Sequence, residues 1–213
     1  MNTGELSPDG KPPGPCAMVI FGATGDLTKR LLVPAIYNLA QAKLLPENFA
    51  IIGVAHRPYS SEEFAEKLKE DVKATAAHPI DDEKWDQAFK GRIFYTSGDL
   101  DDSATYATLA TQLKQIDEEL GTAGNHLFYL ATPPTLFEPI VGHLAEADLT
   151  DESDSPANWK RVVIEKPFGH DLDSARALNH VITSKLDESQ IYRIDHYLWN
   201  ETKQKIILIH FTT

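Results

Sequence analysis

Two short motifs near the end of the chain contain the residue types that transfer protons and bind phosphate. The run RIDHYLWNE at 193–201 places Asp195 beside His196, and the run EKPFGHDL at 165–172 places Lys166 after an apolar stretch. A histidine held by a carboxylate is the usual general base when a hydroxyl loses its proton, and cations such as Lys166, Arg193 and His196 bind anionic substrates. Taken singly, such residues are most often ordinary surface groups. They indicate a site only if the fold brings them together.

A glycine turn near the start of the chain is typical of nucleotide binding. The run VIFGATGDLTKR places Gly22 at the end of an apolar run and Gly25 at the start of an amphipathic one. Glycine lets the backbone approach a phosphate, and the first N–H groups of a helix attract anions. Such turns also occur as plain tight connections, and this one lacks the Gly-Lys-Ser/Thr of a Walker A loop. Its place after the first strand of a βαβ unit favours a pyrophosphate site.

The second apolar run ends in GVAHRP, where cofactor choice is normally determined. An acidic residue at this point binds the ribose hydroxyls of NAD, whereas a basic residue meets the 2′-phosphate of NADP. His56 and Arg57 stand here without an acid, which favours NADP. The alternative, that Arg57 is only a solvated loop cation, stays open.

These motifs follow a regular alternation of strand-like and helix-like segments. Nearly continuous apolar runs predict strands at 16–22, 49–55, 92–97, 126–132 and 160–167. Continuous runs of this kind are typical of a parallel sheet covered on both faces, so we expect a doubly wound, Rossmann-like α/β domain. Ligands bind at the carboxyl ends of the strands in such sheets, which is where the motifs above stand.

Helical periodicity predicts which faces of the intervening segments are buried. A helix over about 25–43 would bury a four-residue stripe, and a second helix, opened by a capping box of Ser60 and Glu63, would bury another. A third stripe follows between the third and fourth runs. The acidic run at 148–158 is expected to be a surface loop. The three stripes are Leu27, Leu31, Ala35 and Leu39; Phe64, Leu68 and Val72; and Tyr106, Leu109, Leu113, Ile116 and Leu120.

The composition limits the function classes. The formal net charge of -12 disfavours nucleic acid and anionic membranes as partners, so any anionic ligand needs a local cluster of cations. No apolar run approaches the roughly 20 residues that cross a bilayer. The lone Cys16 excludes an internal disulfide and fits a reducing compartment, so we expect a cytoplasmic protein. We expect no metal site, and the Pro- and Gly-rich residues 1–15 are expected to be a disordered leader.

Three motifs in this order, FGATGDLTKRLL, EKPFGHDL and RIDHYLWNE, closely resemble the glucose-6-phosphate 1-dehydrogenase family. The resemblance runs from about Ala17 to the end of the chain. It implies oxidation of glucose 6-phosphate at C1 to 6-phosphogluconolactone with NADP as cofactor, the entry to the pentose phosphate pathway. Members of the family are oligomeric, which leaves the state of this chain open, and have a second β+α domain after the nucleotide-binding domain. We expect residues 16–198 to form the nucleotide-binding domain and residues 199–213 to begin the second domain. Most of that second domain is expected to be absent from this chain.

The resemblance also assigns roles to particular residues. The family's GxxGDLxxR turn is matched from Gly22 to Arg30, and the loop at Asp99 and Leu100 would line the cofactor. Lys166 matches the lysine that contacts both cofactor and sugar and takes part in catalysis. His196, Tyr197 and Asn200 would bind the sugar phosphate, and Asp195 would orient a catalytic histidine that lies beyond this chain. The implied cofactor contacts are Gly22, Ala23, Thr24, Gly25, Asp26, Leu27, Thr28, Lys29, His56, Arg57, Asp99, Leu100 and Lys166.

The chain departs from the family pattern in three places. His56 stands where the family usually has arginine, which bears on recognition of the 2′-phosphate. Trp199-Asn200 replaces Gly-Lys, and the loss of that lysine predicts weak binding of glucose 6-phosphate. The domain holding the general base is missing, and His210 in the apolar run KIILIHF is not expected to replace it. We therefore expect this chain alone to turn over no sugar.

Three other interpretations compete with a dehydrogenase domain. An extended short-chain reductase also opens with GATG but needs Tyr-x-x-x-Lys, and none of the 7 tyrosines has lysine four positions later. A non-catalytic module that binds NADP fits the chain physically, because the cofactor motifs are present and the base is absent. An unstable fragment is the third possibility.

Overall fold

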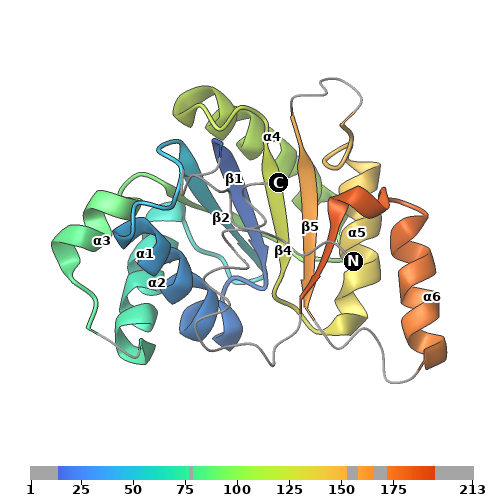
Figure 1. Ribbon diagram of the computed structural model, residues 1–213, viewed down its shortest axis with the longest axis horizontal. Coiled ribbons are helices and arrows are strands. Elements are labelled where there is room, and N and C mark those ends of the chain that lie inside the picture. The colour runs from blue at the N-terminus through green and yellow to red at the C-terminus, as the bar shows by residue number, and fades with distance from the viewer. Residues whose placement is uncertain (1–13, 77–78, 153–157, 166–171, 195–213) are drawn as a thin grey trace.

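The computed structural model describes residues 14–76, 79–152, 158–165 and 172–194 (Figure 1). Within them, six parallel strands form one sheet in the order β3-β2-β1-β4-β5-β6, which is the order of dinucleotide-binding domains. The doubly wound fold expected from the sequence is therefore confirmed. The strands are β1 (Cys16–Phe21), β2 (Phe49–Ala55), β3 (Ile93–Ser97), β4 (His126–Leu130), β5 (Lys160–Glu165) and β6 (Ile191–Ile194).

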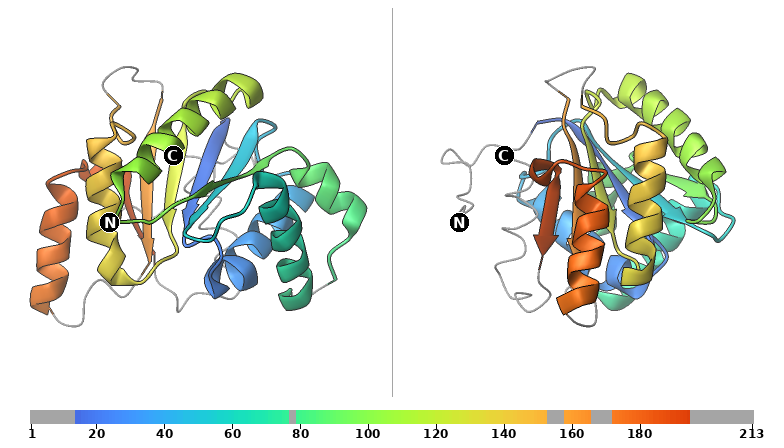
Figure 2. Two further views of the ribbon diagram at one scale, coloured as in Figure 1. Left: turned by 180° about the vertical axis from the view of Figure 1, so that it is seen from behind. Right: turned by 90° about the vertical axis from the view of Figure 1, so that its right-hand side faces the viewer.

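Helices cover both faces of the sheet, and the right-hand view of Figure 2 shows α4 and α5 on one side of it. The π-helix η1 with α1, α2 and α3 packs on one face, and α4, α5 and α6 pack on the other. The helices are η1 (Thr28–Leu32), α1 (Val33–Gln41), α2 (Ser61–Thr75), α3 (Asp82–Phe89), α4 (Ser103–Leu120), α5 (Phe137–Glu146) and α6 (Leu172–Thr183), with single 3-10 turns η2 (Pro134–Leu136) and η3 (Glu188–Gln190).

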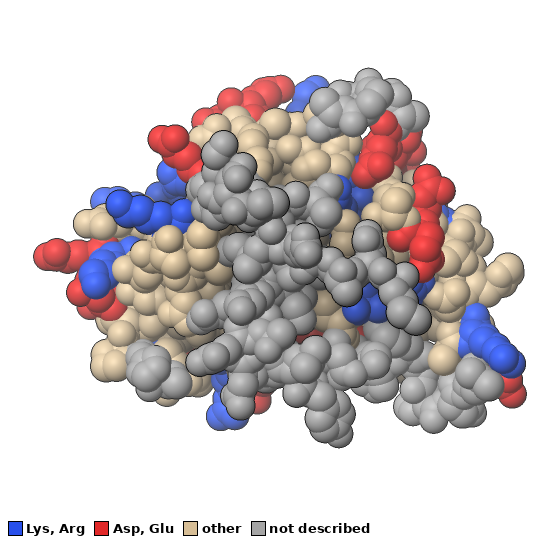
Figure 3. Space-filling model, in the orientation of Figure 1, with Lys and Arg blue, Asp and Glu red and all other residues tan. Residues whose placement is uncertain are grey.

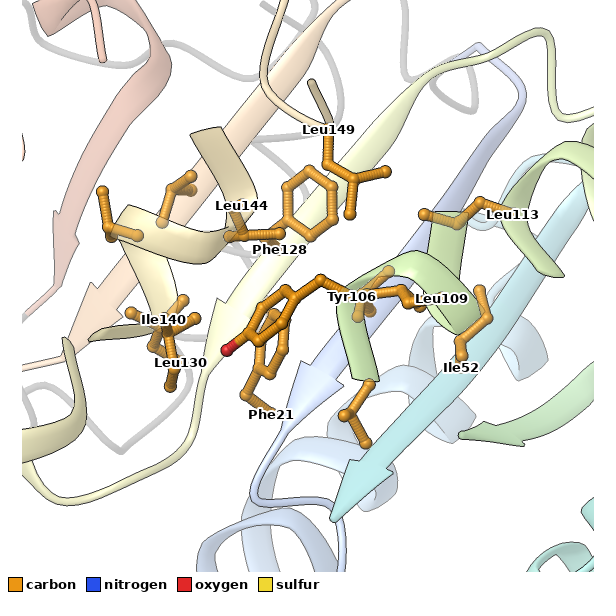
Figure 4. Packing of buried hydrophobic residues seen from close by; sticks show 14 of the residues in the cluster. Phe21, Ile52, Tyr106, Leu109, Leu113, Phe128, Leu130, Ile140, Leu144 and Leu149 are labelled. Atoms are coloured by element: carbon orange, nitrogen blue, oxygen red, sulfur yellow. The ribbon is translucent and has the colours of Figure 1, made fainter. Parts of the chain in front are cut away.

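Alternation along the strands builds two separate apolar clusters. In β1, Met18 and Ile20 face the α1–α3 layer, whereas Val19 and Phe21 face the α4–α6 layer. All six residues of this central strand are buried. Figure 4 shows Tyr106 of α4 lying against Phe21, with ring centroids 5.9 Å apart. Burial on both faces explains why the strands read as continuous apolar runs.

The first helical segment differs from the expected four-residue stripe. A five-residue π-helix, η1, precedes α1, and the N–H of Val33 donates to the carbonyl of Thr28, five residues back. Pro34 lacks an N–H and cannot make the next α-helical bond, so the wide turn lies just before it. The extra residue rotates the buried face: Leu27 and Leu31 are only half-buried, while Leu32 is buried in their place. The expected stripe is wrong over this turn and correct from Ala35 onward.

The second and third stripes are confirmed, although Leu120 is only partly buried. The capping box is also present: the N–H of Glu63 donates to Ser60 Oγ at 3.1 Å, and the N–H of Ser60 donates to Glu63 Oε2 at 2.8 Å. The acidic stretch after α5 was expected to stay on the surface. This expectation is wrong for the first part of the stretch, because Leu149 and Thr150 are buried. The buried Gln190 side chain donates to the Thr150 carbonyl at 2.9 Å and so holds this segment against the sheet.

Both chain ends largely lie outside the described residues, as do 1–13 of the expected leader and 199–213 of the expected second domain. The carbonyl of Pro15 accepts a hydrogen bond from Asn125 Nδ2 at 2.9 Å, which places the start of β1 beside β4. In the ranges that the structure describes, no helix is both long and apolar enough to traverse a bilayer.

A buried ionisable cluster lies at the amino edge of the sheet. His126, which is 5% exposed, places Nε2 3.0 Å from Asp117 Oδ2, and the Lys160 ammonium group donates to the nearby Gly124 carbonyl. Burial lowers the pKa of His126, and the charge of Lys160 adds to this, although Asp117 acts in the opposite direction. Burial alone would raise the pKa of Asp117, but the hydrogen bond to His126 acts in the opposite direction. The pKa of Asp117 is lowered overall. The pair is therefore a carboxylate beside a neutral imidazole.

This cluster predicts that acid destabilises the fold at mildly acidic pH. The unfolded chain, with an ordinary histidine pKa of 6.5, binds a proton that folded His126 resists. The stability is fully present above that value and is lost as pH falls below it. We expect the urea concentration at the unfolding midpoint to decrease as the pH is lowered from about 7 to about 5. His126→Gln should flatten the slope, whereas His180→Gln, an exposed change on α6, should not. An unchanged slope in His126→Gln would contradict the assignment.

Candidate cofactor site

The glycine turn lies at the carboxyl edge of the sheet, at the lower edge in Figure 1. Gly22 has φ +79°, and a Cβ added there would stand 2.4 Å from the carbonyl oxygen of Ala131, just after β4. Only glycine fits this conformation and this close approach. The N–H of Gly22 donates to the carbonyl of Val54 in β2 at 3.0 Å. The turn is thus held between the ends of three adjacent strands.

The residues of this turn divide into supports and exposed groups. The Gly22 carbonyl accepts from the N–H of Gly25 at 2.9 Å and from Thr28 Oγ1 at 3.2 Å. Ala23 and Thr28 are fully buried, so they shape the turn from inside. Thr24, Gly25 and Leu27 are partly exposed, and Asp26 is exposed. The first N–H groups of the following helix have no intrahelical acceptor, so the turn offers donors and a positive dipole end to an anion.

The end of β2 presents His56 and Arg57 to solvent beside this turn. Two hydroxyl groups of β3 fix the backbone there, because the Arg57 carbonyl accepts from Tyr95 Oη at 2.7 Å and from Ser97 Oγ at 3.1 Å. Burial raises the pKa of Tyr95 to about 12, so its phenol stays protonated and donates. The structure therefore holds the backbone of this loop while leaving its two basic side chains exposed.

The loop after β3 is fixed by the start of α4. Thr105 Oγ1 donates to the Asp99 carbonyl at 2.7 Å, and Tyr106 Oη donates to the Leu100 carbonyl at 2.8 Å. The Asp99 side chain is exposed and Leu100 is partly exposed. Both residues follow the third strand, at the same edge as the glycine turn.

Lys29 is tied to the neighbouring helix. Its Nζ lies 2.8 Å from Asp71 Oδ2 of α2, and its side chain is 24% exposed. The Lys29 carbonyl also accepts from Thr75 Oγ1 at 3.2 Å. The segment after the turn and α2 are therefore joined by an ion pair and a hydrogen bond.

The strands that carry the two charged motifs end side by side. Glu165 of β5 lies opposite Ile194 of β6 in the parallel register. The apolar runs of the sequence did not predict a strand over 191–194, so the sixth strand and this pairing are findings of the structure. The motif side chains themselves lie outside the described residues: Lys166, Pro167, Asp195, His196, Tyr197, Trp199, Asn200 and His210.

Arg193 does not contribute its charge as the sequence predicted. It lies opposite Ile164, whose side chain belongs to the cluster under α4–α6, so strand alternation directs Arg193 to that face. Its guanidinium group donates to Glu188 Oε1 at 2.5 Å and to Asn179 Oδ1 at 2.6 Å. The hydrogen bond from Arg193 lowers the pKa of Glu188. The expected group of Lys166, Arg193 and His196 therefore loses Arg193 to an ion pair beside α6.

The sequence did not predict the buried pair at the end of β5. Tyr129 Oη donates to Glu165 Oε1, and each residue is 4% exposed. Burial raises the pKa of Tyr129, and the Glu165 charge raises it further. The signal was present in the EKP motif, where a glutamate ends an otherwise apolar strand. This bond fixes the last residue of β5, directly before Lys166.

On the face that Figure 3 shows, most of the described surface is uncharged, and Lys and Arg lie in small separate groups, several of them beside Asp and Glu. Among the residues that the structure describes, no group of three or more His, Cys, Asp or Glu is placed to hold a metal ion.

Comparison with known proteins identifies relatives over nearly the whole chain. The family model described as glucose-6-phosphate dehydrogenase, NAD binding domain, matches residues 19–205. Glucose-6-phosphate 1-dehydrogenase 2 of Mycobacterium tuberculosis is 43% identical over 198 residues, which are 93% of this chain and 38% of the relative. The Bacillus subtilis glucose-6-phosphate 1-dehydrogenase is 41% identical over 194 residues, covering 91% and 38%. The chain thus spans well under half the length of these relatives.

Two solved structures share the fold. The glucose-6-phosphate 1-dehydrogenase of Mycobacterium avium superposes with a TM-score of 0.73 at 40% identity, covering 86% of this chain and 37% of that one. A glucose-6-phosphate dehydrogenase in complex with its substrate glucose-6-phosphate gives a TM-score of 0.76 at 33% identity, covering 94% and 40%.

The close approach at Gly22 predicts that Gly22→Ala distorts the turn. The left-handed conformation and the clash with the Ala131 carbonyl should destabilise the fold by about 2 kcal/mol or more. Gly142→Ala is the matched control, because a Cβ at this helical position of α5 meets nothing within 4 Å. The control should leave stability unchanged or raise it by about 1 kcal/mol. Urea unfolding measures both, and equal effects would contradict the role of Gly22.

Proposed function

This chain belongs to the glucose-6-phosphate dehydrogenase family, and from that premise we propose that it forms the cofactor-binding part of an enzyme that oxidises glucose 6-phosphate with NADP. The observation that carries the proposal is the Gly22 turn, held between three strand ends at the carboxyl edge of a sheet with the dinucleotide-binding strand order. The family match over residues 19–205 supports the same conclusion.

The cofactor would lie across the carboxyl edge. The partly exposed Thr24, Gly25 and Leu27 surround the helix start that would receive the pyrophosphate. His56 and Arg57 would meet the 2′-phosphate, since both are exposed at the end of β2 and no acidic residue stands there. Asp99 and Leu100, fixed by α4, would line the other side of the cofactor.

The sugar would bind beside β5 and β6. We propose that Lys166 contacts both ligands and takes part in catalysis, that His196, Tyr197 and Asn200 bind the phosphate group, and that Asp195 orients the base. Residues 16–198 would form the nucleotide-binding domain and 199–213 the start of the next domain. The paired ends of β5 and β6 support a common location for these residues.

Each chemical role follows from the reaction. Oxidation at C1 removes a hydride from carbon and a proton from the hydroxyl, and a C=O bond forms as the two leave. Bound NADP supplies the hydride acceptor. The proton needs a general base with a pKa near the working pH, such as a histidine held by a carboxylate. The described residues supply the glycine turn and the fixed strand ends that would hold cofactor and sugar in line.

Binding of NADP without turnover is the outcome that we propose for these 213 residues alone, in line with the second candidate, a non-catalytic NADP-binding module. This proposal is supported by the comparison with the Mycobacterium tuberculosis relative, because the chain matches 38% of that relative's length. Calorimetric titration should show NADP bound more tightly than NAD, and the purified chain with glucose 6-phosphate should form no NADPH. Equal affinities would contradict the NADP assignment, and steady NADPH formation would contradict the inactivity. Location in the cytoplasm stays a prediction.

The replacement of the family's lysine by Asn200 predicts a measurable defect in sugar binding. Asn200→Lys restores a charge-assisted contact to phosphate and should tighten glucose 6-phosphate binding about tenfold, measured calorimetrically with NADP present. Gln41→Lys adds the same charge at the end of α1 and should change nothing. If the unmodified chain already binds the sugar phosphate as tightly as Asn200→Lys, residue 200 does not limit binding.

A further inference from the structure

A small pocket beside the glycine turn is lined by three cationic side chains. It lies between the start of the first helical segment and α2, and its lining includes Thr24, Lys29, Arg57, Lys67 and Asp71. Three of these side chains are cations and one is a carboxylate. A second carboxylate, Glu70, lies 3.5 Å from Lys67, so one positive charge is in excess at this point of a chain whose net charge is -12.

Asp71 holds two of the cations with its two oxygen atoms. Oδ2 lies 2.8 Å from Lys29 Nζ, and Oδ1 lies 3.0 Å from Lys67 Nζ. The side chain of Asp71 is 19% exposed and that of Lys67 is 47% exposed. Burial works against ionisation of Asp71, but the hydrogen bonds from both lysines lower its pKa overall. The bridge is therefore ionic at neutral pH.

Structural support explains only one of these lysines. The Lys29–Asp71 pair joins η1 to α2, but Lys67 and Asp71 stand four residues apart on the same helix. Lys67 therefore adds nothing to the connection between the two elements. Its ammonium group also lies 3.5 Å from Glu70 Oε2, so both of its carboxylate partners stand on α2 itself. The side chain of Lys67 is nearly half exposed and lines the same pocket as Arg57, so an anionic ligand in this pocket would meet its ammonium group.

The position of the pocket indicates which part of a ligand would meet Lys67. In doubly wound sheets the pyrophosphate sits on the glycine turn, and the adenosine ribose sits at the end of the second strand. Arg57 marks that strand end, and it shares the pocket with Lys67. A phosphomonoester at the ribose 2′ position carries close to two negative charges at neutral pH, so Arg57 and Lys67 would both attract it.

We propose that Lys67 is a specificity-determining residue for the 2′-phosphate of NADP, with Asp71 as the positioning residue that holds Lys67 and Lys29 beside Arg57. The proposal rests on the proposed function and deepens it, because it assigns cofactor choice to α2 as well as to the end of β2. It also explains how the site can select NADP although histidine stands at 56, where the family usually has arginine.

The test separates the 2′-phosphate from the rest of the cofactor. Adenosine 2′,5′-bisphosphate and adenosine 5′-monophosphate differ only in that group, and calorimetry with the full chain gives the affinity for each. Lys67→Met should weaken binding of the bisphosphate about tenfold and leave the monophosphate unchanged. Lys67→Arg should retain the preference. Lys73→Met is the matched control on α2, because Lys73 is also ion-paired, to Asp82 at 2.6 Å, but does not line this pocket, and it should change neither affinity.

The outcomes distinguish this inference from the proposed function. If the unmodified chain prefers the bisphosphate and Lys67→Met keeps that preference, Lys67 has no such role while the NADP assignment stands. If Lys67→Met weakens both ligands equally, the effect is not specific to the 2′-phosphate and the inference is wrong. If the unmodified chain binds neither probe, the proposed cofactor site fails together with this inference.

Discussion

The close approach of two backbones at Gly22 is the constraint on which the site depends. The turn after β1 passes so near the segment after β4 that a single added carbon would overlap the Ala131 carbonyl. The same turn takes hydrogen bonds from its own helix through Thr28 and donates to the end of β2 through the Gly22 N–H. A helix start is thereby fixed at the center of the carboxyl edge, where its N–H groups can receive a phosphate.

Charge is distributed in this acidic chain by pairing cations with specific partners. Arg193 is held by Glu188 and Asn179 on the α6 face, away from the expected cluster. Lys29 and Lys67 instead share Asp71 beside the glycine turn, with Arg57 in the same pocket. The excess of positive charge is therefore on the side of the site where the adenosine end of a dinucleotide would lie.

The sequence predicted the features that depend on local pattern and burial. The apolar runs predicted five of the six described strands and the buried core that they form. The capping residues predicted the start of α2 at Ser60. The π-helix was missed because its cause, Pro34 after a long apolar stripe, does not change the hydrophobic period in an obvious way. The Lys29–Asp71 ion pair and the Tyr129–Glu165 hydrogen bond join residues 42 and 36 positions apart, so no local pattern could show them. Arg193 was misplaced because the face of a four-residue strand depends on its register with β5.

The most direct test of the central claim is a nuclear magnetic resonance titration of the isotope-labelled chain with NADP, following backbone amides. The account predicts that the largest shifts occur at the carboxyl edge, at Thr24, Gly25 and Arg57, while the amino-edge amide of His126 stays unchanged. Shifts centred on the amino edge, with the Gly22 turn unaffected, would contradict it.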